Sequence, residues 1–221
     1  MLTTLKRSAR NVLQDTSLWD SIQHVRDGRM VTSWEKAGRP SPPPHAIKRQ
    51  ILSTYAAKYG VTVLVETGTC IGDMVYAMKD KFEKIYSIEL GADLANKATQ
   101  RFHAYQHIQI ICGDSANILP QILSTIHTPC LFWLDGHYSE GFTAKGRVDT
   151  PIMEELSAIL LHQIKAHVIL IDDARCFDGT AGYPKLDELR ELVVANGSGY
   201  QLSALDDVIR IIPRSSKNSA S

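Results

Sequence analysis

The sequence lacks several features that would assign it to other classes of protein. None of its apolar runs approaches the roughly 20 residues that a membrane-spanning helix needs, so we expect no membrane span. Its four cysteines form no Cys-x-x-Cys pair, which favours free thiols in a reducing, cytoplasmic setting. No dense block of Lys and Arg interleaved with aromatic residues is present, so nucleic acid is not an expected partner.

Two common nucleotide-binding motifs are also missing. The sequence Gly-x-x-x-x-Gly-Lys-Ser/Thr does not occur, which excludes a P-loop. The dinucleotide fingerprint Gly-x-Gly-x-x-Gly is absent too, and its nearest counterpart is VETGTCIGD at 65–73, where Cys70 stands between Gly68 and Gly72. A turn of this kind fits either the close approach of a ligand or the packing of the next helix.

What the sequence does contain is ordinary for a globular domain: 221 residues, 44% hydrophobic and 22% charged, with a net charge of zero. The charge is uneven, because residues 1–50 hold nine Lys or Arg against four Asp or Glu and the remainder holds fifteen against twenty. This asymmetry fits either steering of an anionic substrate or a solvated helix face. The basic start lacks the apolar core of a secretory signal and fits a transit peptide or a surface-lying amphipathic helix.

Five nearly continuous apolar runs of strand length follow residue 60, and helical stretches separate them. Such runs are typical of strands buried on both faces of a parallel sheet, here at 61–66, 84–89, 107–112, 130–135 and 166–172. The clearest helix begins at TPIMEEL, where we expect Thr150 to cap and Pro151 to be the first helical residue. The alternation predicts an α/β fold, a doubly wound Rossmann-like sandwich.

The two ends of the chain depart from this alternation. After a helix near 184–196, GYQLSALDDVIRIIP predicts two antiparallel strands joined at Asp206-Asp207, which closes a mostly parallel, seven-stranded sheet with a hairpin. Before the sheet, GRPSPPP precedes a predicted helix at 45–59. We therefore predict an N-terminal helical arm or lid over 1–59, one domain over 60–213 and a disordered tail over 214–221.

Acidic residues stand at the predicted carboxyl ends of all five parallel strands. Ligands of open α/β sheets bind beyond these ends, so the acids predict one shared site. They also favour a cationic ligand over pyrophosphate, and a carboxylate at the second strand's end suits a ribose. The five acids are Glu66, Glu89, Asp114, Asp135 and Asp172.

With these residues in place, the sequence over 60–213 resembles class I S-adenosylmethionine-dependent methyltransferases. VETGTCIGD is similar to the family's first motif, although Cys70 replaces its middle glycine. The resemblance implies that S-adenosylmethionine (SAM) contacts the glycine turn with its methionine part, Glu89 with its ribose and CGDS with its adenine. The implied cofactor-binding residues are Glu66, Gly68, Thr69, Gly72, Glu89, Asp114, Ser115 and Asp135.

A finer resemblance lies in LFWLDGHYS and HVILIDDARCF, which are similar to macrocin-type sugar O-methyltransferases and to catechol O-methyltransferases. It implies that Asp135, Asp172 and Asp173 hold Mg²⁺, provided that a turn begins at Asp173 and brings its side chain to the site. His137 departs from the sugar family's pattern. It fits a metal ligand, a general base that acts with Asp135, or a plain turn histidine.

The long segment 136–149 follows the fourth strand and predicts a lid. We expect contact with the methyl acceptor from Tyr138, Phe142, Lys145, Arg147, Arg175 and Phe177. His107 and His167 precede strands, which indicates structural roles.

The sequence therefore predicts SAM-dependent O-methylation of a hydroxylated small molecule or glycan by direct displacement, with Mg²⁺ assistance. Three alternatives stay open: a metal-independent methyltransferase, an NAD-dependent nucleotide-sugar enzyme, and a non-catalytic partner subunit. The arm also suggests a homodimer.

Overall fold

The structure is a computed structural model that describes residues 17–135, 150–197 and 199–214. The chain forms two compact units, Met1–Lys48 and Arg49–Ser221. Residues 215–221 of the predicted tail lie outside the described residues. No helix among the described residues is long and apolar enough to cross a membrane.

The first unit contains helix α2 (Ser17–Lys36) and the start of α3 (His45–Tyr59). The Trp34 indole donates a hydrogen bond to the Pro40 carbonyl at 2.6 Å, and the Arg39 guanidinium lies 5.0 Å from the centre of the Trp34 ring. These contacts hold the chain that leaves α2 against the last turn of that helix. The predicted helix at 45–59 has the predicted bounds.

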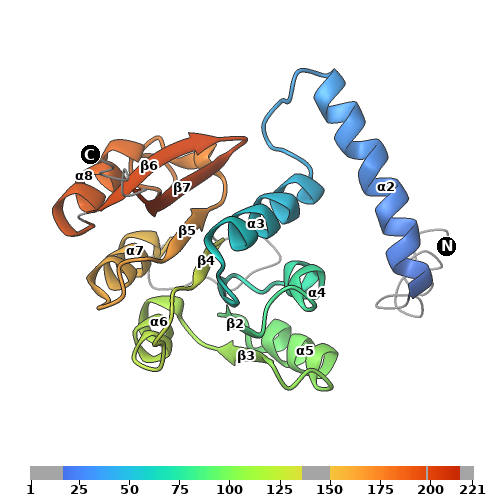
Figure 1. Cartoon of the computed structure of the whole chain (residues 1–221), viewed down its shortest axis with the longest axis horizontal. Coiled ribbons are helices and arrows are strands. Elements are labelled where there is room, and N and C mark those ends of the chain that lie inside the picture. Colours follow the sequence, from blue (N-terminus) through green and yellow to red (C-terminus); the bar gives the residue numbers. More distant parts are fainter. Residues whose placement is uncertain (1–16, 136–149, 198, 215–221) are drawn as a thin grey trace, which may run out of the picture. The chain divides into compact units, whose positions relative to one another are not determined.

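The described part of the second unit contains one seven-stranded sheet of order β3-β2-β1-β4-β5-β7-β6 (Figure 1). Strands β1 to β5 are parallel, and β7 is antiparallel to both β5 and β6. This order confirms the predicted doubly wound sheet with its closing hairpin. The strands are β1 (Val63–Thr67), β2 (Lys84–Glu89), β3 (Ile108–Cys112), β4 (Leu131–Leu134), β5 (Val168–Ile171), β6 (Tyr200–Leu205) and β7 (Val208–Pro213).

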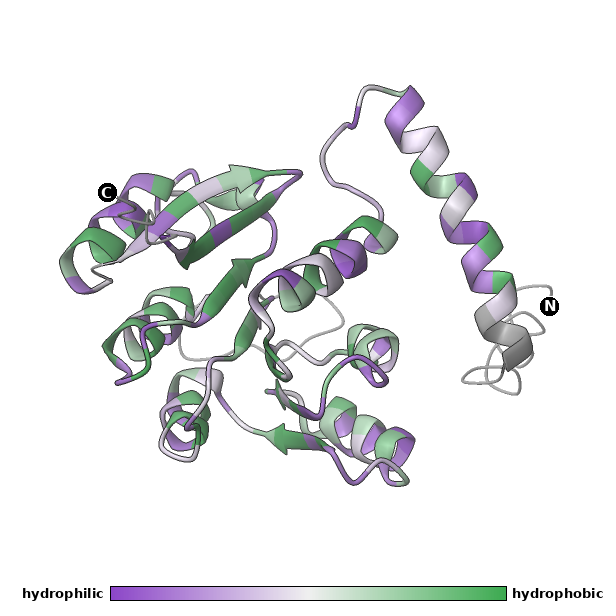
Figure 2. Cartoon of the chain, viewed as in Figure 1, coloured by the Kyte–Doolittle hydropathy of each residue, from purple (hydrophilic) through white to green (hydrophobic). Residues whose placement is uncertain are grey.

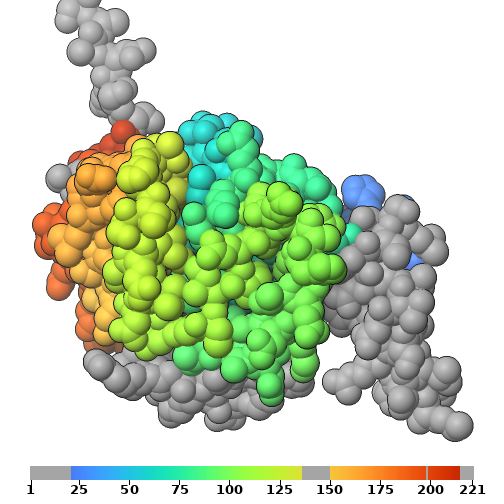
Figure 3. Space-filling model, turned by 90° about the horizontal axis from the view of Figure 1, so that it is seen from below, coloured from blue at the N-terminus to red at the C-terminus, as the bar shows by residue number. Residues whose placement is uncertain are grey.

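Helices cover both faces of the sheet (Figure 1). One face carries α3, α4 (Asp73–Met78) and α5 (Ala92–Phe102). The other carries α6 (Ser115–Leu123), α7 (Ile152–Leu161) and α8 (Leu186–Asn196), and residues around α6 lie between those of α5 and those of α7 in the space-filling view (Figure 3). A short 3₁₀ turn, η1 (Ala174–Cys176), follows β5.

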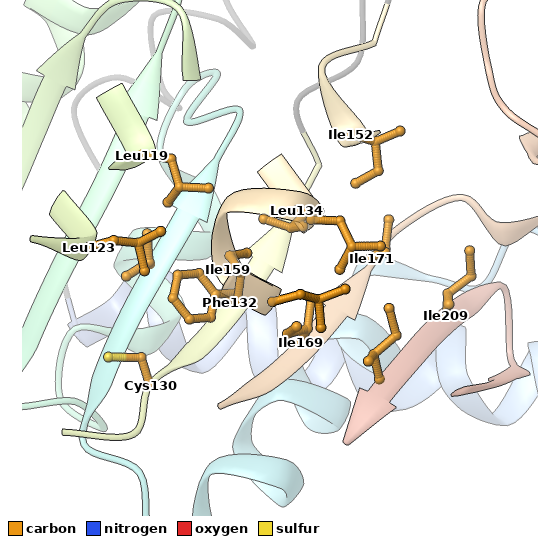
Figure 4. Close-up of a cluster of buried hydrophobic side chains, with 14 of the residues drawn as sticks. Leu119, Leu123, Cys130, Phe132, Leu134, Ile152, Ile159, Ile169, Ile171 and Ile209 are labelled. Carbon is orange, nitrogen blue, oxygen red and sulfur yellow. The ribbon is translucent and has the colours of Figure 1, made fainter. Parts of the chain in front are cut away.

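The main hydrophobic core lies between the sheet and helices α6, α7 and α8 (Figure 4). Phe132 and Ile169 point into this core, whereas the fully buried Trp133 lies outside that cluster because successive side chains of a strand alternate between faces. The central strands β4 and β5 are buried throughout and entirely hydrophobic (Figure 2), which is why their sequences are continuous apolar runs.

Two predicted turns have different outcomes. Asp206 and Asp207 both have positive φ, 49° and 58°, and join β6 to β7 as a two-residue hairpin turn, as predicted. The predicted cap of α7 is wrong: Pro151 itself is the N-cap, and no side chain caps the helix. At φ −84° and ψ 13°, Pro151 lies outside the α-helical region, so it flanks the helix and Ile152 is the first helical residue.

Candidate functional site

The carboxyl ends of the parallel strands meet at one edge of the sheet, where β1 and β4 are neighbours. The chain leaves β1 toward β2 on one side, while β4 lies on the other side, so this edge contains the point at which the strand order reverses. Ligands of doubly wound folds bind at such a point. The predicted acids follow or end the strands here.

The glycine turn after β1 has left-handed backbone at Gly68, Cys70 and Gly72, with φ of 87°, 50° and 78°. A side chain at Gly72 would place its Cβ 2.6 Å from the Phe102 ring, so this glycine is required by the packing of α5. Arg101 of α5 also donates to the Ile71 carbonyl at 2.6 Å. The second glycine of the motif therefore serves helix packing, while Gly68 stands at the strand end itself.

Glu66 is buried at 1% exposure and belongs to a chain of side-chain hydrogen bonds. The Ser87 hydroxyl donates to Glu66 Oε2 at 2.5 Å and lies 2.6 Å from the Thr69 hydroxyl. The register of β1 and β2 pairs Glu66 with Ser87 directly. Sequence reasoning missed Ser87, although a small polar side chain within the run KIYSIE is the signal that could have revealed it.

The environment of Glu66 opposes its ionisation. Burial raises the pKa of Glu66 to about 8, the negative charges of Asp135 and Glu89 add to the rise, and the Ser87 hydrogen bond offsets only part of it. A positively charged ligand at this edge would bind the ionised form of Glu66 more tightly than the neutral form and so lower the pKa of Glu66.

The Glu89 carboxylate accepts hydrogen bonds from the backbone of two turns. Its Oε2 accepts the Cys70 backbone N–H at 2.7 Å, and its Oε1 accepts the Gly91 N–H at 2.8 Å. Each carboxylate oxygen can accept two hydrogen bonds, so both oxygens retain capacity for a ligand hydroxyl. Glu89 is 3% exposed and therefore already rigid.

Asp114 and Ser115 open helix α6. The Asp114 side chain accepts from the Ala116 N–H at 3.0 Å and from the Asn117 side chain at 3.2 Å, so Asp114 is the N-cap of α6. Ser115 is buried beside it. The structure thus gives Asp114 a structural role, and the predicted contact with adenine stays a prediction.

Three acids converge at the ends of β4 and β5. Asp135, Asp172 and Asp173 each offer a carboxylate oxygen, and these oxygens lie within 4.8 Å of one another. Strand β5 ends at Ile171 and Asp173 is left-handed at φ 56°, so the turn on which the prediction depended does begin there. Carboxylate oxygens at this spacing fit a hard divalent cation.

Arg175 already provides a positive charge to this cluster. It contacts Asp173 Oδ1 at 2.8 Å and also pairs with Asp207 of the β6–β7 turn. Tyr183 lies close enough to Asp173 and Asp135 for their charges to add to the rise that burial produces in its pKa. Sequence reasoning missed Tyr183, which belongs to an irregular segment without a motif. Phe177, expected to contact the acceptor, is buried at 6% exposure.

Glu155 of α7 is a second acid that the sequence reading missed. It is 1% exposed, and burial raises its pKa to about 7 even though the Ser115 and Thr67 hydroxyls lower it. Its signal is an acid within the apolar stripe of α7, where Ile152, Leu156 and Ile159 are buried.

The remaining predicted residues divide into two groups. His137, Tyr138, Phe142, Lys145 and Arg147 lie outside the described residues. The two histidines expected to be structural have structural contacts: His107 lies 2.7 Å from the Lys79 carbonyl, and His167 accepts from the Cys130 N–H at 3.1 Å.

The fold is similar to that of solved methyltransferases. An O-methyltransferase from Bacillus cereus in complex with S-adenosylhomocysteine (SAH) has 13% identity and a TM-score of 0.58, covering 95% of this chain and 97% of its own. The O-methyltransferase TomG from Streptomyces achromogenes, in complex with SAM, has 12% identity and a TM-score of 0.56 over 85% and 89%. SAH-bound PaMTH1 from Podospora anserina has 15% identity and a TM-score of 0.52 over 90% and 97%.

The sequence itself gives no such match: no family model fits the chain, and no curated protein matches it. At these identities the structural likeness establishes a shared fold only.

Proposed function

We propose that the chain is a SAM-dependent methyltransferase that methylates a hydroxyl oxygen of a small molecule or glycan by direct displacement. The observation that carries this proposal is the burial of Glu66 and Glu89 beside a left-handed turn at the ligand edge of a methyltransferase-type sheet. Buried carboxyls are costly unless a positive partner arrives, and SAM carries a sulfonium and an ammonium.

In this proposal different residues bind different parts of SAM, the methyl donor. The turn at Gly68, Thr69 and Gly72, together with Glu66, binds the methionine part, and Glu89 accepts the ribose hydroxyls. Asp114 and Ser115 bind near the adenine, and Asp135 lies between donor and acceptor. The support is the rigid placement of Glu89 by two backbone N–H groups at 2.7 and 2.8 Å, because preorganised acceptors bind without further ordering.

When bound, SAM would supply a methyl group already activated on sulfur, with SAH as the leaving group and the proton of the acceptor hydroxyl released. The protein's contribution is to align the acceptor oxygen with the methyl group and to take up the proton. We assign proton uptake to His137, which follows Asp135 by two residues in the sequence.

Asp135, Asp172 and Asp173 would hold Mg²⁺, which when bound would lower the pKa of the acceptor hydroxyl. Their oxygen donors and mutual distances support this assignment. One contact favours metal-independent transfer instead: Arg175 pairs with Asp173 at 2.8 Å and so already neutralises one of the three charges. Activity that is lost in EDTA and restored by Mg²⁺ supports the metal, and full activity in EDTA rejects it.

The compartment and the oligomeric state are proposed from the cysteines and from the N-terminal arm. Four free cysteines support a reducing, cytoplasmic setting. The arm at 1–59 is proposed to form a homodimer. Light scattering of the full chain tests the dimer directly.

Thermal shift with SAH and NAD side by side tests the donor. We expect SAH to raise the melting temperature and NAD to leave it unchanged; the reverse result would establish a nucleotide-sugar enzyme. Glu89→Gln should weaken SAH binding by about tenfold, since a charged acceptor is worth about 1.5–3 kcal/mol. Asp93→Asn, an exposed acid four residues later, is the matched control and should bind normally. SAH binding without turnover of any acceptor would favour the non-catalytic subunit.

A further inference from the structure

A buried acid lies on the opposite face of the sheet from Glu66. Glu155 projects from the first turn of α7 within a stripe of buried apolar side chains, and it is 1% exposed. Thr67 belongs to the same face, because it alternates with Glu66 along β1 and pairs with Leu134 and Ile88, both members of the hydrophobic core. Burial of a carboxyl here opposes folding, so its presence calls for a reason other than packing.

The Glu155 carboxyl of α7 lies beside hydroxyl groups of two other elements. The hydroxyls of Ser115, at the start of α6, and of Thr67, at the end of β1, lie close enough to lower its pKa. Thr67 Oγ1 and Glu155 Oε1 nevertheless lie buried without a hydrogen bond of normal geometry. The cluster of Glu155, Thr67 and Ser115 is therefore polar, dehydrated and only partly satisfied, which is a costly arrangement for a fold to keep.

Both hydroxyl residues are neighbours of the proposed donor site. Thr67 stands between Glu66 and Gly68, and Ser115 follows the N-cap Asp114 directly. Any shift of α6 relative to β1 would therefore move the residues assigned to adenine away from the glycine turn. We infer that Glu155 is a positioning residue for the adenine end of the donor site, holding the start of α6 at a fixed distance from the end of β1; this inference rests on the proposed function.

Substitution at Glu155 separates positioning from packing. Glu155→Leu removes the buried carboxyl and fills its place with an apolar side chain, so we expect this variant to be at least as stable as wild type at pH 8. We expect its affinity for SAH to fall about tenfold all the same, because the buried hydroxyls of Ser115 and Thr67 lose the polar group that lies beside them. Glu155→Gln keeps the shape and polar groups and should remain within about threefold of wild type. A purely structural role cannot raise stability while lowering affinity.

The location of the effect is tested with 5′-methylthioadenosine, which contains the adenosine part of the donor without its amino-acid part. Calorimetry should show Glu155→Leu losing affinity for SAH and 5′-methylthioadenosine by the same factor. Glu66→Gln, at the methionine end, should lose affinity for SAH alone. Glu154→Gln, the exposed neighbour on the same turn, is the matched control and should bind both ligands normally.

Two results would overturn the inference: normal binding of both ligands by Glu155→Leu, or a loss confined to SAH. Should Glu155→Leu fail to fold, Thr67→Val provides the second test, since it removes the hydroxyl on the β1 side of Glu155 with little change in volume and should weaken both ligands equally. If wild-type protein binds neither ligand, the proposed function fails and this inference with it. If wild type binds SAH and the variants match it, only the inference fails.

Discussion

Buried polar groups differ between the two ends of the parallel strands in how well the fold satisfies them. Beyond the carboxyl ends, Glu66 is an acid whose burial opposes its charge. Before the amino ends, the Cys130 N–H donates to His167 Nδ1 at 3.1 Å, and His167 Nε2 lies 2.9 Å from His162 Nδ1. Because His167 Nδ1 accepts, its Nε2 carries the proton and donates to His162, so both rings are neutral and satisfied.

The difference supports the proposed placement of the ligand at the carboxyl edge of the sheet. At the histidine edge every bond is made within the fold, and burial together with the neighbouring His162 and Lys165 lowers the pKa of His167 to about 4. At the acid edge the protein retains groups that reduce its own stability. Such unfavourable groups concentrate at functional sites, where a ligand supplies the missing interaction.

The largest effect should follow from removing the acid at the ligand edge. The unfolded Glu66 carboxyl ionises near pH 4.5 and the folded one near pH 8, so the free energy of unfolding falls as the pH rises between these values. Glu66→Gln removes this loss and should stabilise the protein by up to about 4 kcal/mol at pH 8, while it weakens SAH binding. Denaturant titrations at pH 5 and pH 8 measure the difference.

The exposed Glu83→Gln provides the control for that experiment and should leave the pH profile unchanged. If the free energy of unfolding of Glu66→Gln changed with pH as it does in wild type, Glu66 would not be a source of the pH dependence, and the proposed difference between the two edges would be refuted.

A smaller effect of opposite sign is expected at the histidine edge. Unfolded His167 takes up a proton near pH 6.5 and the folded residue only near pH 4, so the free energy of unfolding should fall by about 3 kcal/mol as the pH drops between these values. His167→Gln should abolish this part of the slope, whatever its effect on stability at pH 7. The exposed His103→Asn should retain the wild-type slope, and an unchanged slope in His167→Gln would refute the neutral pair.

The smallest expected effect is the destabilisation caused by alanine in the glycine turn, which has a contribution from packing and one from backbone conformation. Gly72→Ala should destabilise by about 2–3 kcal/mol, because a left-handed φ alone costs about 1–2 kcal/mol and the new methyl group would also meet Phe102. Gly60 has a similar φ of 62° with nothing within 4 Å of its Cβ position, so Gly60→Ala isolates the conformational part. Equal losses in thermal denaturation would mean that Phe102 moves aside freely.

The sequence predicts this fold well because its signals are local. Continuous apolar runs, a Pro-rich break and an Asp-Asp turn each specify their own segment, and the closing hairpin follows from them. The acids at the strand ends were also visible, since parallel strands bring their carboxyl ends together. For Asp173 the sequence leaves the direction of the side chain open, because that direction depends on the left-handed backbone of Asp173 itself, which no sequence motif encodes.

Other site features depend on contacts between distant segments. Ser87 gains its place from the register of two strands, and Glu155 from the packing of α7 against α6 and β1. Neither contact produces a recognisable motif in the sequence, although both residues are polar where the pattern predicts an apolar side chain. Polar residues at otherwise apolar positions are therefore the sequence signal that marks these two site residues.

Calorimetric titration of SAM into the full chain tests the central claim most directly. We predict saturable heat at one site per chain, with binding weakened in Glu66→Gln and retained in Glu83→Gln. An absence of heat with both SAM and SAH would contradict the account, and the buried acids of the ligand edge would then need another partner.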